Sequence, residues 1–230
     1  MIKKNSLTFL LLFIFLFSIA MAADEAMKSG ASRMEMSDSK RYDPPLPVSL
    51  IGTKLDGQVN FMTCAWFTRV EIDPYMFGIS IQKQHFTHKA IMENRCFSIN
   101  IPVIDMIPQV NAVGMVSGKE YDKSKVFDVF YGDNENCPMV DGSIVTFECE
   151  VVNSVDLAEP DEAHPRAHTL FIGEVKNVWV NKNGVKDNGL DFETLNPIIW
   201  TLSPNSFWTL GENQGRAFNR EYLKLVPKKQ

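Results

Sequence analysis

The sequence predicts a mainly β protein with short helices, folded as an antiparallel barrel. Three observations carry this prediction: segments with strand character are short and numerous, only two stretches have helical character, and strands and helices do not alternate along the chain. The absence of alternation argues against a Rossmann sheet. Neither a GxGxxG nor a GxxxxGKS/T loop is present, so nucleotide binding through such loops is not expected.

The composition narrows the class of protein. The 230 residues are 45% hydrophobic and 22% charged, which is typical of a globular chain with one main domain. The formal net charge is -5 at pH 7, and no basic stripe or arginine-rich run occurs. Nucleic acid is therefore not an expected partner.

The N-terminus has the three-part pattern of a secretory signal peptide, over residues 1–22. Lys3 and Lys4 precede the apolar run "LTFLLLFIFLFSIA", and small residues follow up to Ala22, where we expect cleavage. The alternative is an uncleaved anchor, but the run is short for a span of about 20 residues. Export to the periplasm or the cell exterior is predicted. Residues 23–44 are polar without period and predict a linker or arm, and the domain is expected over 45–230.

The first half of the domain predicts hairpins and two helices. "PVSLIGT" and "GQVNFM" flank Asp56-Gly57, a strong signal for a tight hairpin. The stretch 59–81 reads as two strands joined by a turn at Asp73-Pro74, and "CFSINIP" is a further strand. "THKAIMENR" predicts a helix capped by Thr87. "IDMIPQVNAVGMV" predicts a second helix, capped by Asp105 with Pro108 in its first turn.

The second half predicts two long strands. Residues 117–142 are rich in loop-forming residues, and "SIVTFECEVVNSV" and "HTLFIGEVKNVWVN" then alternate with period two. Four cysteines occur, Cys64, Cys96, Cys137 and Cys149, an even number that permits disulfides in an exported protein. Cys149 alternates with polar neighbours as an inward-facing residue does, and mostly free, buried thiols are predicted. No zinc-finger spacing is present, so no metal and no zinc are expected.

Histidines and a possible anion site are the chemical candidates, since no GxSxG elbow occurs. His164 and His168 are four residues apart, but Pro165 argues against a helix that would pair them on zinc. His168 opens a strand, where it either faces a pocket or is an inert strand-end histidine. "QKQHFTHK" places Lys83, two histidines and Thr87 at a helix start, which suits a phosphate group; the alternative is a plain capped helix with a solvated lysine.

The small residues before Trp66 are a second candidate site. Thr63, Cys64 and Ala65 would let a flat ligand approach the backbone closely, with Trp66 as a wall of the site. The alternative is a core tryptophan beside small packing partners.

Several motifs in order resemble the flavin reductase-like family, the flavoredoxin branch in particular. "NFMTCAWF", "DPYMFGISI", "HFT" and "NIP" match successive blocks typical of that family. "VNAVGMVSGKEYDKSKVF", "AHTLFIGEV" and "FWTLGENQGRAF" are similar to its later segments, so the resemblance spans residues 45–219. It implies a Greek-key split β-barrel that binds FMN, in preference to FAD, and forms a homodimer.

The resemblance also implies a set of site residues. Residues lining the flavin would be Asn60, Thr63, Cys64, Ala65, Trp66, Ser80 and Gln82. Phe86 and Thr87 would lie at the phosphate end, where Lys83 or His88 would supply charge. His168 would lie near the reactive face of the ring and is the predicted catalytic residue. The chain departs from the family where Tyr75 replaces a proline, where "QKQHFT" lacks an arginine, and where no acid precedes His168.

The predicted function is that of an exported FMN-binding flavoprotein, a flavin-dependent oxidoreductase that transfers electrons or reduces a substrate. The alternatives are a non-catalytic FMN-binding electron carrier and a split-barrel module that has lost flavin. Because NAD(P)H is made inside cells, the expected electron donor for an exported protein is a redox protein or a small molecule, and NAD(P)H is left open as a donor.

Overall fold

The computed structural model describes residues 36, 42–162, 165–187, 189–214 and 217. The chain divides into two compact units, residues 1–42 and 43–230, and every element below belongs to the second. The predicted signal peptide lies outside the described residues, as does the predicted linker except for residues 36 and 42–44. Among the described residues, no helix is both long and apolar enough to cross a membrane.

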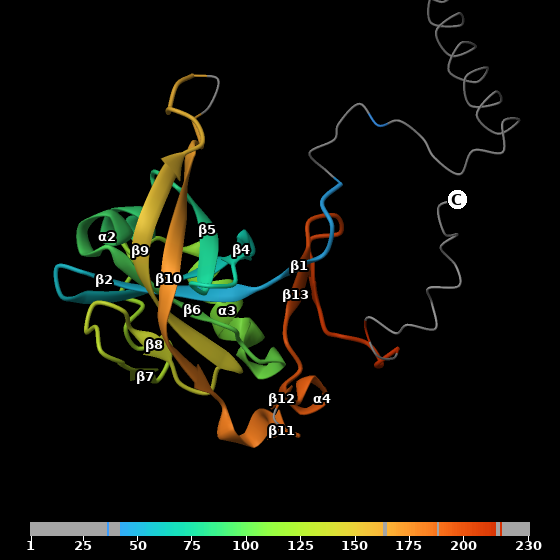
Figure 1. The fold of residues 1–230 in the computed structure, drawn as a ribbon. Coiled ribbons are helices and arrows are strands. Elements are labelled where there is room, and N and C mark those ends of the chain that lie inside the picture. The colour runs from blue at the N-terminus through green and yellow to red at the C-terminus, as the bar shows by residue number, and fades with distance from the viewer. Residues whose placement is uncertain (1–35, 37–41, 163–164, 188, 215–216, 218–230) are drawn as a thin grey trace, which may run out of the picture. The chain divides into compact units, whose positions relative to one another are not determined.

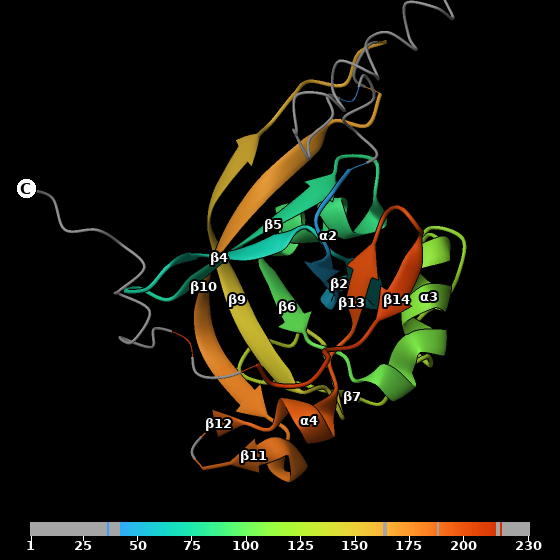
Figure 2. The ribbon, with the colours of Figure 1, turned by 90° about the vertical axis from the view of Figure 1, so that its right-hand side faces the viewer.

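One seven-stranded antiparallel sheet dominates the fold, with the strand order β3-β2-β6-β9-β10-β5-β4 (Figures 1 and 2). Its strands are β2 (Ser49–Leu55), β3 (Gln58–Cys64), β4 (Phe67–Glu71), β5 (Met76–Gln82), β6 (Cys96–Asn100), β9 (Val145–Asp156) and β10 (His168–Val180). The prediction of a mainly β, antiparallel protein is confirmed.

The sheet curls into a barrel that is split between β3 and β4. These strands lie at opposite edges of the sheet, yet they follow each other along the chain. Cys64 ends β3 and Phe67 begins β4, so their Cα atoms are at most roughly 11 Å apart. The connecting residues are fixed to β5, because the Ser80 N–H donates to the carbonyl oxygen of Trp66 across 2.9 Å. The two edges of the sheet must therefore approach each other at this point.

Both predicted turns are confirmed. Asp56 and Gly57 have φ angles of 52° and 81° in the β2–β3 hairpin, the left-handed values that this two-residue turn requires. Residues 72–75 form the turn between β4 and β5. The prediction that residues 59–81 hold two strands was incomplete, because the chain breaks at Ala65 and Trp66 and the stretch contributes to three strands.

The two predicted helices are present, but both predicted caps were wrong. The first helix is α2 (Phe86–Asn94), whose N-cap is His85. Thr87 lies inside its first turn, and its hydroxyl accepts a hydrogen bond from Asn60 instead of capping the helix. A 3₁₀ helix, η2 (Ile104–Met106), precedes α3 (Ile107–Met115). Asp105 falls within η2 and Met106 caps α3, while Pro108 is in the first turn of α3 as predicted.

Shorter elements complete the fold. Three of them form a separate sheet in the order β1-β13-β14, which is joined to the start of β2 by a 3.0 Å hydrogen bond from Val48 N to Ile198 O. These strands are β1 (Leu46–Pro47), β13 (Ile199–Thr201) and β14 (Ser206–Trp208). The remaining elements are β7 (Val129–Phe130), β8 (Met139–Val140), η3 (Lys182–Gly184), β11 (Val185–Lys186), β12 (Gly189–Leu190) and α4 (Phe192–Leu195). The predicted loop-rich stretch 117–142 contains only β7 and β8.

The core occupies the inside of the barrel and extends between β2, β3 and α3. Large side chains without solvent exposure fill it: Leu50, Ile51, Phe61, Ile79, Ile81, Phe97, Ile99 and Phe171. Cys149 faces this core, as its alternation predicted. All four cysteines are free and buried, in agreement with the sequence-based expectation.

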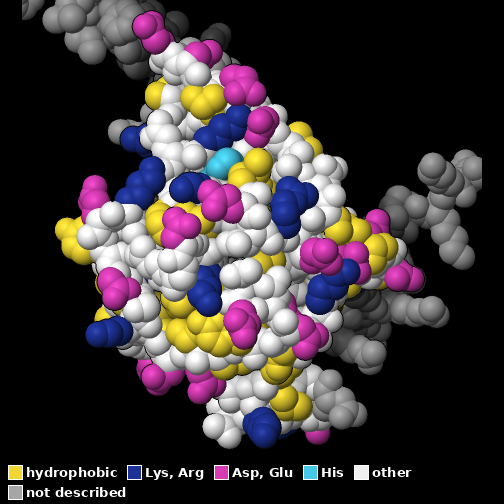
Figure 3. Space-filling view, turned by 90° about the vertical axis from the view of Figure 1, so that its left-hand side faces the viewer, with side chains coloured by type: hydrophobic (Ala, Val, Ile, Leu, Met, Phe, Trp, Pro, Cys, Tyr) yellow, Lys and Arg dark blue, Asp and Glu magenta, His cyan; other side chains and the backbone are white. Residues whose placement is uncertain are grey.

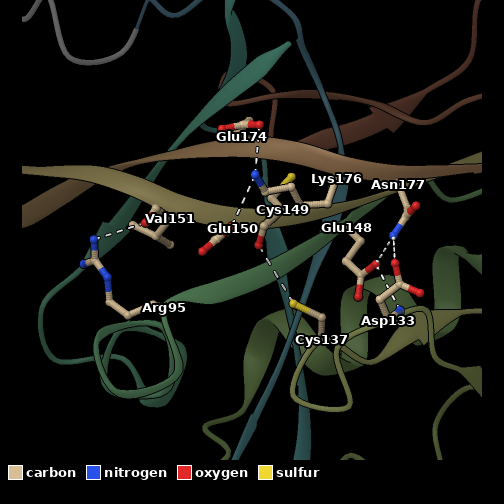
Figure 4. A network of polar contacts seen from close by, with 10 residues as sticks. All are labelled: Arg95, Asp133, Cys137, Glu148, Cys149, Glu150, Val151, Glu174, Lys176 and Asn177. Carbon is tan, nitrogen blue, oxygen red and sulfur yellow. Dashed lines mark hydrogen bonds and ion pairs between the residues drawn. The ribbon is translucent and has the colours of Figure 1, made fainter. Parts of the chain in front are cut away.

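The outward side of β9 is covered by a loop that Glu148 holds in place. Glu148 follows Phe147 and is only 3% exposed. Its carboxylate accepts hydrogen bonds from the N–H of Asn134 at 2.8 Å, the N–H of Asp133 at 3.3 Å and Nδ2 of Asn177 at 2.8 Å (Figure 4). The alternation along β9 places Glu148 on the side opposite Phe147 and Cys149, and the residues after β7 fold back over it.

The surface carries both signs of charge. On the face shown in Figure 3, Lys and Arg side chains are interspersed with Asp and Glu side chains, without a broad patch of one sign. Lys176, for example, forms ion pairs with Glu174 at 2.9 Å and with Glu150 at 3.3 Å. This pattern agrees with the lack of a basic stripe in the sequence.

Candidate functional site

Two adjoining cavities form one cleft beside the split in the barrel. Each has a volume of about 270 Å³, and they share the lining residues Met62, Thr63 and His85. We call them the helix-end cavity and the aromatic cavity. The helix-end cavity is lined by Asn60, Met62, Thr63, His85, Phe86, Thr87, Lys123 and residues 113–118. The aromatic cavity is lined by Val48, Met62, Thr63, Cys64, Ala65, Trp66, Ser80, Gln82, His85, His168, Trp200 and Phe207.

Lys123 brings a buried positive charge to the helix-end cavity. Its side chain is among the buried polar groups, and Nζ donates to the carbonyl oxygens of Phe61 at 3.0 Å and Val113 at 2.8 Å. No described carboxylate forms an ion pair with it. Burial lowers the pKa of Lys123 to about 8, because the charged form loses solvation. An anion in this cavity would supply the missing counter-charge.

Asn60 presents an unused acceptor to the same cavity. Its Nδ2 donates to Thr87 Oγ1 at 2.9 Å, while its Oδ1 is buried and has no hydrogen-bond partner. Gly118 packs directly on this oxygen, since a Cβ atom at Gly118 would lie 2.4 Å from Asn60 Oδ1. A buried acceptor without a donor is rare in proteins, which points to a donor group supplied by a ligand.

The first turn of α2 completes the helix-end cavity. Phe86 and Thr87 are its first two residues and both line the cavity. The N–H groups at a helix start have no partner within the helix, and the helix dipole makes this end positive. Together with Lys123 they form a site for an anion, next to an acceptor that needs a hydroxyl or N–H donor.

The aromatic cavity is mostly apolar, and four ring side chains besides His85 line it: Trp66, His168, Trp200 and Phe207. Trp66 is 49% exposed at its mouth, and its ring centroid lies 5.0 Å from that of His168 at an interplanar angle of 45°. His168 opens β10 directly opposite Gln82 of β5. Thr63, Cys64, Ala65 and Trp66 all line this cavity.

Cys64 is a wall of this cavity and not a reactive thiolate. Its Sγ donates to the Trp66 carbonyl oxygen at 3.6 Å, and the residue is only 6% exposed. Burial raises the pKa of the Cys64 thiol to about 12. The raised pKa favours the protonated thiol at neutral pH over the reactive thiolate.

His85 stands where the two cavities meet. Burial of the ring lowers its pKa, and the positive charges of His168 and Lys123 lower it further. A neutral imidazole at neutral pH is the result. Among the described residues, no group of three or more His, Cys, Asp or Glu side chains is arranged to hold a metal ion.

Comparison with known families identifies the fold. Residues 42–200, most of the described chain, match the Flavin reductase like domain. The chain belongs to the flavin reductase-like family. Flavoredoxin from Methanosarcina acetivorans is 31% identical, and its structure superposes with a TM-score of 0.76 over 85% of this chain and 100% of that one. Flavoredoxin of Desulfovibrio vulgaris is 25% identical, with a TM-score of 0.72 over 82% and 100% of the two chains.

Two relatives found by sequence comparison are uncharacterised proteins, so they suggest no activity for this chain. An uncharacterised protein of Pyrococcus abyssi is 27% identical over 160 residues, which is 68% of this chain and 88% of that protein. An uncharacterised protein of Archaeoglobus fulgidus is 26% identical over 148 residues, or 64% of this chain and 78% of that protein. Membership in the flavin reductase-like family confirms the resemblance drawn from the sequence and the split-barrel fold.

The cleft gathers all the site residues expected from the family resemblance except Lys83 and His88. Lys83 Nζ pairs with Asp156 at 2.9 Å and Glu159 at 3.2 Å. His88 Nε2 lies 2.9 Å from Thr169 Oγ1, which donates its own proton to Asp156 at 2.6 Å, so His88 is the donor. Both side chains thus connect α2 and the end of β5 to the β9–β10 hairpin, outside the cleft.

Among the lining residues that the sequence did not single out, three bring a charge or an aromatic ring to the cleft. Lys123 is one of several lysines in a loop-rich stretch, and its burial depends on Phe61, which is 62 positions away. Trp200 and Phe207 lie in the aromatic C-terminal stretch, where spacing alone does not show which rings face a cavity. The one available signal was the family-like segment "SGKEYDK", whose last residue is Lys123.

Proposed function

We propose that this chain binds FMN in the cleft and transfers electrons through it, as a flavoprotein of the flavin reductase and flavoredoxin type. The observation that carries the proposal is that one cleft has a polar, positively charged end and an aromatic end. One end offers Lys123, the start of α2 and the free Asn60 Oδ1, and the other is an aromatic slot. Family membership supports a flavin-related electron-transfer role.

The helix-end cavity fits the ribityl phosphate. A phosphate monoester there would accept hydrogen bonds from Lys123 Nζ and from the N–H groups of Phe86 and Thr87. A ribityl hydroxyl would donate to Asn60 Oδ1, the buried acceptor that the protein itself leaves unpaired. FMN is proposed over FAD because a terminal phosphate suffices to fill this end of the cleft.

The aromatic cavity fits the ring of the flavin. Each cavity alone is slightly smaller than the 300–1,000 Å³ usual for ligand pockets, and the two joined fall within that range. Backbone groups of Cys64 and Ala65 would face the polar rim of the ring, and Trp66 would wall its edge. Bound flavin supplies one- and two-electron chemistry, while the protein sets its orientation and potential.

His168 is the residue we propose for proton exchange at the flavin. It lines the aromatic cavity, and its imidazole is the one described histidine side chain that lies against Trp66 beside the proposed ring site. The residue directly before it is Ala167 and not an acid, so we propose that Trp66, whose ring lies against it, positions the imidazole.

We also infer export and a homodimer. Export is supported by the signal-peptide pattern of residues 1–22, and the N-terminal sequence of the secreted protein would test it. The homodimer is supported by the family resemblance, and light scattering of the purified protein would test it. The proposed partner is a redox protein or a small electron donor.

The visible absorption spectrum of the purified full chain, before and after incubation with FMN and desalting, tests the proposal. Retained absorption bands of oxidised flavin are the expected result. A protein that stays colourless after incubation with FMN would contradict it and would favour a split barrel that has lost its cofactor. Bound flavin that no electron donor reduces catalytically would favour a carrier.

A further inference from the structure

The aromatic cavity is a slot between two sheets. The seven-stranded sheet supplies one side through the end of β3, through Ser80 and Gln82 on β5, and through His168 on β10. The three-stranded sheet supplies Trp200 from β13 and Phe207 from β14. Figure 2 shows β13 and β14 in front of β2, and Figure 1 places the same sheet beside it. Both walls of the slot are therefore made by the protein.

The side chains of Trp200 and Phe207 form one continuous surface. They are directly opposite each other in the β13–β14 pair, so their side chains share one face of the sheet. The family match ends at residue 200, which places β14 and Phe207 beyond it. Phe207 lies in "FWTLGENQGRAF", the segment that resembles the later part of the family, so this second wall begins where the family-model match ends.

The wall is held firmly in position. Trp200 Nε1 donates to Asn205 Oδ1 at 2.7 Å across the turn, and Thr201 Oγ1 donates to the carbonyl oxygen of Pro204 at 2.6 Å. Trp200 and Phe207 also pack against the core cluster that contains Val48, Leu50 and Ile198. Moving Phe207 aside would remove its packing against this cluster, and moving Trp200 would also break its hydrogen bond to Asn205, so widening the slot costs stabilising contacts.

We propose that Trp200 and Phe207 restrict the slot to a single planar ring and so prevent a nicotinamide from stacking on the bound flavin. This inference rests on the proposed function. Hydride transfer from NAD(P)H oxidises the nicotinamide to its cation and, with one proton from solvent, reduces the flavin by two electrons. It requires the two reacting atoms to be about 3–3.5 Å apart with the rings aligned. A slot of about 270 Å³ is small for two stacked rings, so a second ring on the bound flavin would have to displace Trp200 or Phe207.

Electrons must then pass through the open edge of the slot. That edge is where Trp66 is half exposed beside His168 and where His85 reaches the surface. A donor that gives single electrons without stacking can use it, and two such transfers together with two protons reduce the flavin fully. The class of donor that the geometry fits is a one-electron redox protein.

The test compares Phe207→Ala with Trp208→Ala in the FMN-bound full chain. Trp208 is the next residue on β14, is 50% exposed and does not line the slot, so it is a matched control. The first readout is the long-wavelength charge-transfer absorbance that NAD⁺ produces when it stacks on chemically reduced flavin. The second is the rate at which NADH reduces the bound flavin without oxygen.

The wild type and Trp208→Ala are expected to show no charge-transfer band, whereas Phe207→Ala should show one. NADH should reduce the flavin of Phe207→Ala at least about tenfold faster than that of the wild type. Phe207→Leu should lie between them, and it replaces the alanine variant if that protein fails to fold. A charge-transfer band in the wild type, or reduction of the wild type by NADH as fast as that of Phe207→Ala, would overturn this inference alone. Failure of the wild type to bind flavin would overturn the proposed function as well.

Discussion

Asn60 Nδ2 donates to Thr87 Oγ1 across 2.9 Å, and this contact joins strand β3 to the first turn of α2. It fixes the amide so that Oδ1 stays buried without a partner in the helix-end cavity. The same hydrogen bond removes Thr87 from a capping role. One side-chain contact therefore explains both the failed prediction of the cap and the orientation of the acceptor proposed to receive a ribityl hydroxyl.

Replacing Asn60 by aspartate should weaken FMN binding more than riboflavin binding. The variant keeps the shape of the side chain, and the Thr87 hydroxyl can donate to it, but it adds a negative charge beside the proposed phosphate. We expect the dissociation constant for FMN to rise by roughly tenfold or more, and that for riboflavin by less. Titrations by flavin fluorescence quenching measure both. An equal change for the two ligands would argue against a phosphate at this end.

Lys123→Met should raise the dissociation constant for FMN by roughly 10–100-fold, since a charge-assisted hydrogen bond is lost. Lys125→Met is the matched control, because Lys125 is exposed two positions away and does not line the cleft. The control should bind FMN as the wild type does. If both variants bind FMN with unchanged affinity, the phosphate does not contact Lys123.

The same lysine should make the stability of the ligand-free protein depend on pH. The pKa of Lys123 is lowered from 10.5 to about 8 in the folded protein. Between these values the unfolded chain holds a proton that the folded chain lacks, so the free energy of unfolding should rise as pH increases from about 8 to about 10.5. Urea unfolding across this window should show a smaller rise for Lys123→Met than for Lys125→Met. Parallel curves would mean that Lys123 titrates normally.

Gly118→Ala should damage the helix-end cavity. A Cβ atom there would lie 2.4 Å from Asn60 Oδ1 and 3.0 Å from Phe86 Cδ1, so both side chains would have to shift. We expect at least about a tenfold loss of FMN affinity, because the displaced groups form the proposed site. Gly189→Ala is the control, since its nearest neighbouring atom would be 3.7 Å away. Unchanged FMN binding by Gly118→Ala would show that this loop does not shape the site.

Glu148→Gln should destabilise the fold without involving the cleft. Its carboxylate accepts hydrogen bonds from Asn134, Asp133 and Asn177, and an amide would turn one acceptor into a donor facing a donor. A loss of about 2–3 kcal/mol in the free energy of unfolding is expected. Glu150→Gln should cost less than about 1 kcal/mol, because Glu150 forms an exposed ion pair with Lys176. Urea unfolding of both variants makes the comparison, and similar losses would contradict the assigned role of Glu148.

Local sequence patterns predicted much of the fold. The Asp56-Gly57 turn and the alternation in β10 depend only on neighbouring residues, and both were found as expected. The position of β3 and β4 at opposite edges of the sheet depends on contacts far apart in the chain, which periodicity does not encode. The antiparallel barrel was predicted from the number and shortness of the strands, and its split from the family resemblance, but neither from any single strand.

In the candidate site too, local patterns were predicted from the sequence and long-range contacts were not. Residues 63–66 were predicted to line a site because small residues next to a tryptophan form a local pattern, and they do line the cleft. Lys83 was placed there by its position before α2, but Asp156 and Glu159, more than 70 positions away, hold it elsewhere. Lys123 was missed for the converse reason, since distant carbonyl oxygens bury it in the cavity.

The most direct test of the central claim is the affinity of the full chain for FMN compared with riboflavin, measured by quenching of flavin fluorescence at fixed salt concentration. Binding through Lys123 and the start of α2 predicts one flavin per chain and an affinity for FMN at least about tenfold higher, since only FMN carries the phosphate. Equal affinities, or no binding of either flavin, would contradict the claim that this cleft holds FMN by its phosphate.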